Sequence, residues 1–233
     1  MTTEIRRLVL WDIDGTLVDS ARLGREAFVE AFEAVTGSVA ARPVSLAGRT
    51  DLEIALDMLE TAQVDTSDGV LDRFALALER AMAARAEPLR KKGRALPGAH
   101  AALARLDREP GVIQSLLTGN IAPNAAVKLG VFGLDRHLDL EVGAYGSDHR
   151  SRGELVTVAR RKAERKYMAL IPPARTVLIG DTPLDIAAAK HGGARAIGVA
   201  TGPYDELALS AAGADDVLDD LNDDQCLVAA VLA

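Results

Sequence analysis

The chain has 233 residues, a formal net charge of −7 and 3% aromatic residues. This length suffices for one α/β domain with a large insertion, or for two small domains. The acidic balance, without a cluster of basic and aromatic residues, argues against a nucleic-acid partner. Cys226 is the single cysteine, which excludes an internal disulfide, and no stretch reaches the length of a membrane span. We therefore expect a cytoplasmic protein that binds neither nucleic acid nor membrane.

The first part of the chain predicts one strand followed only by helices. Residues 6–12 form an apolar run of the length of a buried strand. Apolar side chains then recur every three to four residues, as on one face of a helix. The predicted helices lie within residues 21–36, from residue 50 onward, and within 69–87. We interpret residues 20–90 as an all-helical cap inserted into a core of residues 1–19 and 91–233.

The second part alternates between strand and helix patterns. The expected strands are 112–117, a weaker one at 138–142, 176–179, 196–199 and 216–218. The expected helices among them are 99–108, 123–130, 151–167 and one from 183 to about 192. Alternation of this kind predicts a parallel sheet with helices on both faces. The fold class is therefore α/β, with a three-layer Rossmann-like core and the inserted helical cap.

Polar residues follow three of the predicted strands. Asp12 and Asp14 follow the first strand, and their side chains would lean the same way because side chains alternate along a strand. Two carboxylates this close repel each other, which a metal ion or a shared proton would offset. Thr118 and Asp181 follow two further strands. Since the carboxyl ends of parallel strands meet at one edge of the sheet, we expect all four residues in a single crevice.

Four short motifs occur in order along the chain. They are Asp12-x-Asp14-Gly15-Thr16, the strand ending in Thr118-Gly119, a basic residue at the start of the helix after His149, and Gly180-Asp181-x-x-x-Asp185. Their order and spacing resemble the haloacid dehalogenase-like (HAD) hydrolase superfamily. The segments Leu96-Pro97-Gly98 and Gly48-Arg49-Thr50-Asp51 further resemble its phosphoglycolate phosphatase-like branch, in which a helical cap lies between the first two motifs.

The resemblance implies a mechanism through an aspartyl-phosphate that depends on Mg²⁺. Asp12 would attack phosphorus, and Asp14 would act as general acid and then as general base. Asp12, the backbone carbonyl of Asp14, and Asp181 would hold Mg²⁺, which prefers oxygen ligands. Thr118 and the backbone N–H groups from Gly119 onward would bind a phosphoryl oxygen, although both residues also suit an ordinary strand-to-helix turn.

Three further positions carry alternatives. Asp185 would support the metal ligands without binding the ion, or act only as an acidic residue in the first turn of its helix. Relatives commonly have a lysine in the third motif, where this chain has arginines; we favour Arg152 for binding phosphate and keep Arg150 as the alternative. Arg49 of the cap would contact the substrate, or lie on the surface beside a helix.

The function expected from this pattern is Mg²⁺-dependent hydrolysis of a small phosphorylated metabolite similar to phosphoglycolate. Asp14 argues against the metal-free dehalogenases, which lack this second acid, and residues 1–90 contain no lysine for the Schiff base of the phosphonate hydrolases. A sugar phosphomutase and a non-catalytic binding module on the same fold remain alternatives. We expect a monomer or a homodimer.

Overall fold

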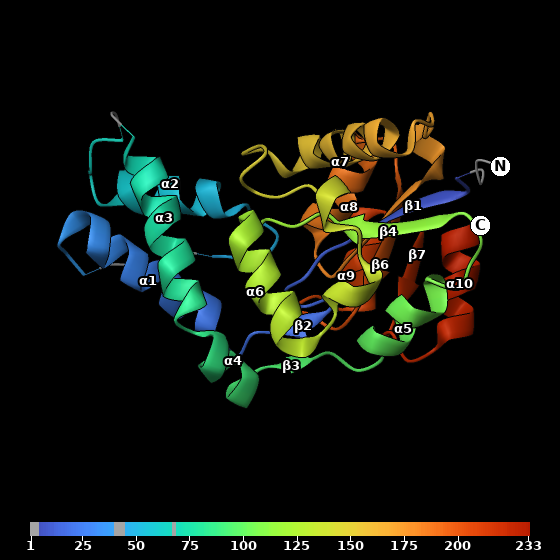
Figure 1. Cartoon of the computed structure of the whole chain (residues 1–233), viewed down its shortest axis with the longest axis horizontal. Helices are drawn as coiled ribbons and strands as arrows, with labels where there is room; N and C mark the ends of the chain where they lie inside the picture. Colours follow the sequence, from blue (N-terminus) through green and yellow to red (C-terminus); the bar gives the residue numbers. More distant parts are fainter. Residues whose placement is uncertain (1–4, 40–44, 67–68) are drawn as a thin grey trace.

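A computed structural model describes residues 5–39, 45–66 and 69–233. Its centre is a parallel sheet of five strands in the order β4-β1-β5-β6-β7 (Figure 1). The strands are β1 (Arg7–Trp11), β4 (Val112–Leu116), β5 (Thr176–Gly180), β6 (Arg195–Val199) and β7 (Asp216–Leu218). Trp11 is in register with Leu116 on one side and with Ile179 on the other. The neighbouring strands β4, β1 and β5 therefore end level with one another.

Helices cover both faces of this sheet, so the side chains of β1 are buried on both. Val9 and Trp11 pack on one face, with α5 (Ala99–Leu106), α6 (Ala122–Phe132) and α10 (Asp224–Leu232). Leu8 and Leu10 pack on the other, with α7 (Arg152–Tyr167), α8 (Pro183–His191) and α9 (Glu206–Ala212). Burial on both sides matches the continuous apolar pattern of the strand. The predicted three-layer α/β core is confirmed.

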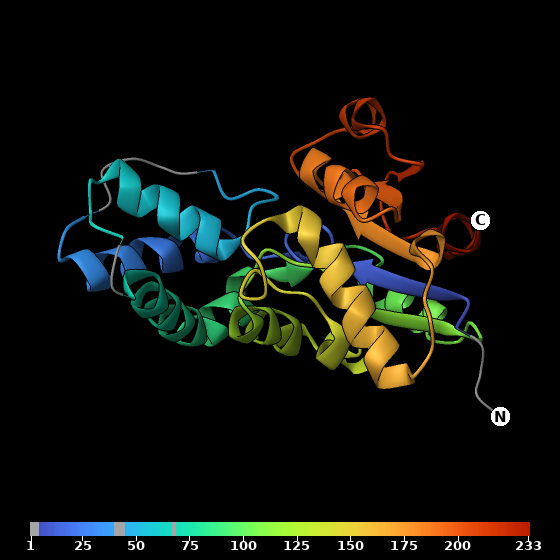
Figure 2. The same cartoon turned by 90° about the horizontal axis from the view of Figure 1, so that it is seen from above.

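Four helices form a separate layer beyond the ends of the strands (Figures 1 and 2). They are α1 (Leu23–Thr36), α2 (Asp51–Thr61), α3 (Val70–Ala83) and α4 (Ala86–Lys92). The chain enters and leaves them through β2 (Val18–Asp19) and β3 (Arg94–Ala95), which pair in antiparallel fashion. Their apolar core includes Ile121 at the start of α6. Helix α6 thus packs both on the sheet and on the cap.

The weak strand predicted at 138–142 is wrong. That region contains two short 3₁₀ turns, η1 (Asp135–His137) and η2 (Leu140–Val142), and a third, η3 (Pro173–Arg175), precedes β5. The Asp139 carboxylate accepts a hydrogen bond from the backbone N–H of Glu141, which favours a turn over an extended chain. The only bridge of this region to the β4 side joins Leu117 and Ala144 within the described residues.

The long helix predicted within 69–87 is divided into α3 and α4, and the pairing of β2 with β3 was not predicted. None of the helices in the described ranges combines the length and the apolar character that a membrane span requires.

Candidate active site

Three loops that follow the level strand ends meet at one pocket. The backbone N–H of Asp12 donates to Ile179 O at 2.9 Å, and that of Thr118 donates to Ala144 O at 3.0 Å. Asp12, Thr118 and Asp181 are all buried. They line a pocket of about 400 Å³, to which the cap contributes residues such as Phe28 and Arg49. A volume of this order suits a small metabolite.

The loop after β1 is shaped around the carboxylate of Asp181. Gly15 has a φ of +86°, and a Cβ atom there would overlap Asp181 Oδ2. A Cβ at Gly202 would overlap the same oxygen from the opposite loop. Thr16 Oγ1 donates to Asp181 Oδ1 at 3.1 Å, and Thr201 Oγ1 donates to Gly15 O at 2.6 Å. Only residues without a side chain let the backbone approach this carboxylate so closely.

Asp12, Asp181 and Asp185 form a buried acidic cluster, in which one carboxylate oxygen of each lies within 4.8 Å of the others. Burial raises the pKa of Asp12 to about 7, and the charges of Asp185 and Asp14 act in the same direction. Burial and the neighbouring Asp12 raise the pKa of Asp181 well above its usual value. Three carboxylates around one point are costly without a cation. Their oxygen atoms are donors that fit a Mg²⁺ ion.

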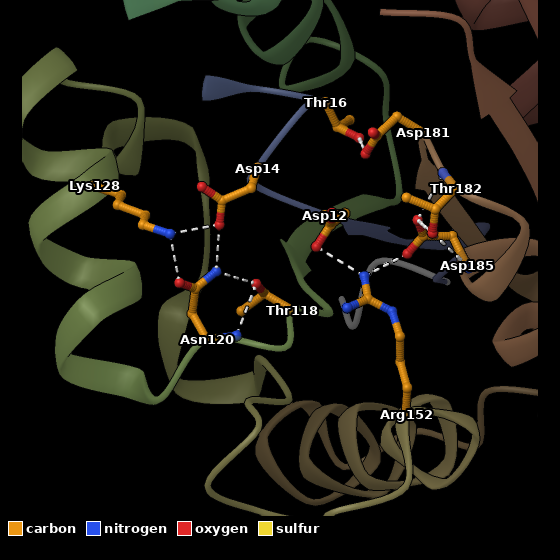
Figure 3. A network of polar contacts seen from close by, with 10 residues as sticks. All are labelled: Asp12, Asp14, Thr16, Thr118, Asn120, Lys128, Arg152, Asp181, Thr182 and Asp185. Carbon is orange, nitrogen blue, oxygen red and sulfur yellow. Dashed lines mark hydrogen bonds and ion pairs between the residues drawn. The ribbon is translucent and has the colours of Figure 1, made fainter. Parts of the chain in front are cut away.

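Arg152, the first residue of α7, neutralises part of this cluster. Its Nη2 lies 2.8 Å from Asp12 Oδ1 and also contacts Asp185 Oδ1 (Figure 3). Burial disfavours its charge, but Asp185 and Asp12 outweigh this and raise its pKa. Its Nε is buried and has no acceptor among the described residues. Arg150 is exposed, and its backbone carbonyl accepts from Thr50 Oγ1, so the structure brings Arg152 and not Arg150 to Asp12.

Asp185 contributes both to its own helix and to the cluster. Thr182 and Asp185 form a reciprocal capping box at the start of α8, in which the backbone N–H of Thr182 donates to Asp185 Oδ2 at 3.0 Å. The other oxygen, Oδ1, contacts Arg152. The two interpretations of Asp185, as an acidic residue in the first helical turn and as a support of the site, therefore both match its position.

The side chain of Asp14 turns away from Asp12, toward α6 (Figure 3). Its Oδ2 accepts from Lys128 Nζ at 2.5 Å and from Asn120 Nδ2 at 2.8 Å, and its Oδ1 accepts from Ser20 Oγ at 3.1 Å. Lys128 Nζ also donates to Asn120 Oδ1 at 2.7 Å. Burial alone would raise the pKa of Asp14, but Lys128 and these hydrogen bonds outweigh it and lower the pKa. Asp14 is therefore held in its ionised form.

A family model described as haloacid dehalogenase-like hydrolase matches residues 9–190. The chain belongs to this family. No match was found among curated protein sequences.

Solved structures of the same fold cover nearly the whole chain. A hydrolase from Pseudomonas syringae has a TM-score of 0.70 and 24% identity, over 97% of this chain and 99% of its own. CbbY from Rhodobacter sphaeroides, solved with phosphate, has a TM-score of 0.72 and 22% identity, over 94% and 96%. A predicted phosphoglycolate phosphatase from Haemophilus somnus 129pt has a TM-score of 0.68 and 19% identity, over 98% and 100%. At these identities the likeness shows the fold alone.

In this haloacid dehalogenase-like hydrolase, most of the residues predicted for the site lie around the pocket, but Arg49 is turned aside. Its Nε lies 3.0 Å from Glu53 Oε1 and its Nη1 lies 3.0 Å from Asp57 Oδ2, both on helix α2, which begins two residues after Arg49. These two carboxylates outweigh partial burial and raise its pKa. The backbone of Arg49 is nevertheless part of the site, because its carbonyl oxygen lies against Gly119.

Sequence reasoning missed Lys128, which is 5% exposed and contacts Asp14. The sequence argument considered only lysines in residues 1–90, where there are none, whereas Lys128 reaches the pocket from the core. A single lysine among the alanine, valine and leucine residues of α6 was a usable signal, since an isolated charge on an apolar helix requires a partner.

Proposed function

We propose that this haloacid dehalogenase-like hydrolase is a Mg²⁺-dependent phosphatase that acts on a small phosphorylated metabolite through an aspartyl-phosphate. The observation that supports it most is the buried position of Asp12 between Arg152 and a cluster of carboxylates. A bound Mg²⁺ would screen the repulsion between the nucleophilic carboxylate and an anionic phosphoester. Asp12, Asp181 and the backbone carbonyl of Asp14 would hold it, and Asp185 would support them by fixing Arg152.

In the first step, an oxygen of Asp12 attacks phosphorus and the bond between phosphorus and the leaving oxygen breaks. Asp14 enters this step protonated, having taken up a proton after it leaves Lys128, whose charge lowers its pKa, and it gives that proton to the leaving alkoxide. In the second step, Asp14 removes a proton from water, the water oxygen bonds to phosphorus, and the bond to Asp12 breaks. Asp14 must rotate from α6 toward the phosphoryl group for both transfers, since Lys128 and Asn120 hold it aside in this structure.

The phosphoryl oxygens would be bound by groups that still have an unused hydrogen-bond donor. Thr118 Oγ1 accepts from Asn120 Nδ2 at 2.8 Å and from the Asn120 backbone N–H at 3.2 Å, so its own proton is free to donate. Arg152 has a buried Nε without an acceptor in the described part of the chain. A planar guanidinium suits the dispersed charge of a phosphoryl group in its transition state.

The proposed substrate class is a small phosphoester similar to phosphoglycolate. It is supported by the pocket of about 400 Å³ and by the motifs around Arg49 and Pro97. One of the similar structures is described as a predicted phosphoglycolate phosphatase. Asp14 and Asp12 are both present, so a non-catalytic binding module is the weaker alternative. A sugar phosphomutase would use the same pair and transfer the phosphoryl group without releasing phosphate. The proposal includes a monomer or a homodimer.

The test is release of phosphate from p-nitrophenyl phosphate and from a panel of phosphorylated metabolites, with Mg²⁺ and with EDTA. We expect Mg²⁺-dependent release by the wild type and none by Asp12→Asn, which keeps the size of the side chain but loses the nucleophilic carboxylate. Equal rates for the two proteins would refute the proposal. Product analysis of sugar phosphates separates the mutase, since isomerised phosphoester would then accumulate in place of free phosphate.

A further inference from the structure

One short segment of the cap contacts three core loops around the site. We call residues 48–51 the cap latch. Its contacts are Asp51 N–H to Gly119 O at 2.7 Å, Thr50 Oγ1 to Arg150 O at 2.8 Å, and Gly48 against Thr182, where a Cβ would come within 2.7 Å of Oγ1. These loops follow β4, precede α7 and follow β5. The cap therefore directly contacts loops that carry residues of the site.

Asp51 supplies a hydrogen bond that helix α6 cannot make for itself. The first N–H groups of a helix lack partners within the helix, and a polar side chain at the first position usually satisfies one. Here that position is Ile121, which has no side-chain oxygen. Its backbone N–H donates to Asp51 Oδ2 at 2.8 Å, and Asn124 Nδ2 lies 3.5 Å from the same oxygen. Asp51 is 6% exposed, so water does not replace it while the cap is seated.

The loop between β4 and α6 is also confined sterically. A Cβ at Gly119 would overlap the carbonyl oxygen of Arg49 in the cap latch. A Cβ at Gly146 would overlap the carbonyl oxygen of Gly119 from the other side. Together with the hydrogen bonds of Asp51 to Gly119 O and from the N–H of Ile121, these contacts restrict the loop while the cap is seated. Without the cap, the N–H of Ile121 loses its acceptor and the side chain of Ile121 loses its apolar surroundings.

We propose that Asp51 is a positioning residue that couples seating of the cap to the geometry of the loop at residues 118–121. This rests on the proposed function in one respect, namely that Thr118 and Gly119 bind the phosphoryl group. Asp51 lines the pocket, but its Oδ2 accepts from the backbone N–H of Ile121, and we assign it no contact with the reacting atoms; it acts through the loop. Because coupling between two events is reciprocal, phosphate bound at this loop stabilises the seated cap.

Kinetics of matched variants test the coupling. Asp51→Leu removes both carboxylate oxygens, whereas Asp51→Asn keeps one acceptor for the N–H of Ile121. Asp72→Leu is the control, because Asp72 is also an aspartate in the first turn of a cap helix but is exposed. We expect Asp51→Leu to lower kcat about 10- to 100-fold, since small displacements of binding groups have effects of this order. Asp51→Asn should restore most of this loss, and Asp72→Leu should behave as wild type.

Amide hydrogen exchange of a peptide covering residues 118–124 gives a readout independent of activity. We expect faster exchange in Asp51→Leu than in wild type and Asp51→Asn, and slower exchange of residues 48–52 in the wild type when inorganic phosphate and Mg²⁺ are added. If the leucine variant does not fold, Asp51→Ala serves the same comparison, with protection of β1 as the criterion of folding.

Unchanged exchange at 118–124 in the folded variant would overturn the coupling. Faster exchange with a wild-type kcat would overturn the positioning role. An inactive wild type with faster exchange in Asp51→Leu would refute the proposed function and leave the coupling in place.

Discussion

Replacement of Arg152 by methionine tests how the acidic cluster is held together. The guanidinium contacts Asp12 and Asp185, and the three side chains are 7% exposed or less. Removal of one partner from a buried ion pair costs about 3–5 kcal/mol of unfolding free energy, because the charge left behind is neither paired nor hydrated. We expect a loss of this size at pH 8 in the absence of Mg²⁺.

The loss should be smaller at pH 5, and its sign follows from the pKa values. The pKa of Asp12 is raised to about 7 in the folded protein, so at pH 5 Asp12 is protonated there. The pKa of Asp181 is raised as well, so fewer unpaired charges remain after Arg152 is removed. A folded state that holds more protons than the unfolded state becomes less stable as the pH rises. Without Arg152 the pKa of Asp12 rises further, which extends this decline toward pH 8.

Urea unfolding followed by tryptophan fluorescence measures this effect, because Trp11 is the single tryptophan and is fully buried beside Asp12. Arg150→Met is the matched control, since Arg150 is exposed; its change should stay within about 0.5 kcal/mol. A loss below about 1 kcal/mol in Arg152→Met at pH 8, or an equal loss at pH 5 and pH 8, would refute this account of the cluster.

Three further predictions concern the surroundings of the pocket. Burial raises the pKa of Asp51 from its ordinary value near 4 to about 6, so the wild type should lose stability relative to Asp51→Asn by about 3 kcal/mol between pH 3.5 and pH 7 in urea unfolding; a difference that does not vary with pH would contradict this. Lys128 lowers the pKa of Asp14, so Lys128→Met should move the pH above which turnover of alkyl phosphates declines to a higher value, with less effect for p-nitrophenyl phosphate, whose leaving group needs no proton from Asp14; unchanged pH–rate profiles would argue against this influence of Lys128 on Asp14. Gly119→Ala should lower kcat and accelerate exchange of residues 48–52, because the new Cβ would overlap Arg49 O; wild-type exchange would show that the contact can relax.

The core could be predicted because its signals are local. The apolar run of β1 and the turn residues after β4 and β5 identify strands and their ends without knowledge of the partners. Parallel strands place their carboxyl ends at one edge, so Asp12, Thr118 and Asp181 could be assigned to one site before any geometry was known. The roles assigned to these residues stay predictions until activity is measured.

The parts that could not be predicted depend on contacts between distant segments. The pairing of Val18 with Ala95 joins residues that only the cap brings together, and no periodicity marks two-residue strands. Residues 138–142 carry apolar side chains that fit a strand, but the hydrogen bond from Glu141 N–H to Asp139 favours a turn.

The side-chain directions in the pocket could not be predicted from the sequence either. The orientation of Arg49 depends on Glu53 and Asp57, which lie on the same helix and compete with the pocket for its guanidinium. Lys128 is eight residues from Asn120, and its contact with Asp14 exists only once α6 packs beside β1. Spacing within a motif therefore identifies candidate residues, whereas the partner of each charge is decided by tertiary packing.

The central claim is that Asp12 carries the phosphoryl group during turnover. It is tested most directly by rapid acid quenching of the enzyme with substrate and Mg²⁺, followed by peptide mass spectrometry. We predict a phosphoryl adduct on the peptide that contains Asp12, absent from Asp12→Asn and from samples with EDTA. The account would be contradicted if wild type and Asp12→Asn released phosphate at the same rate and the wild type carried no adduct on that peptide.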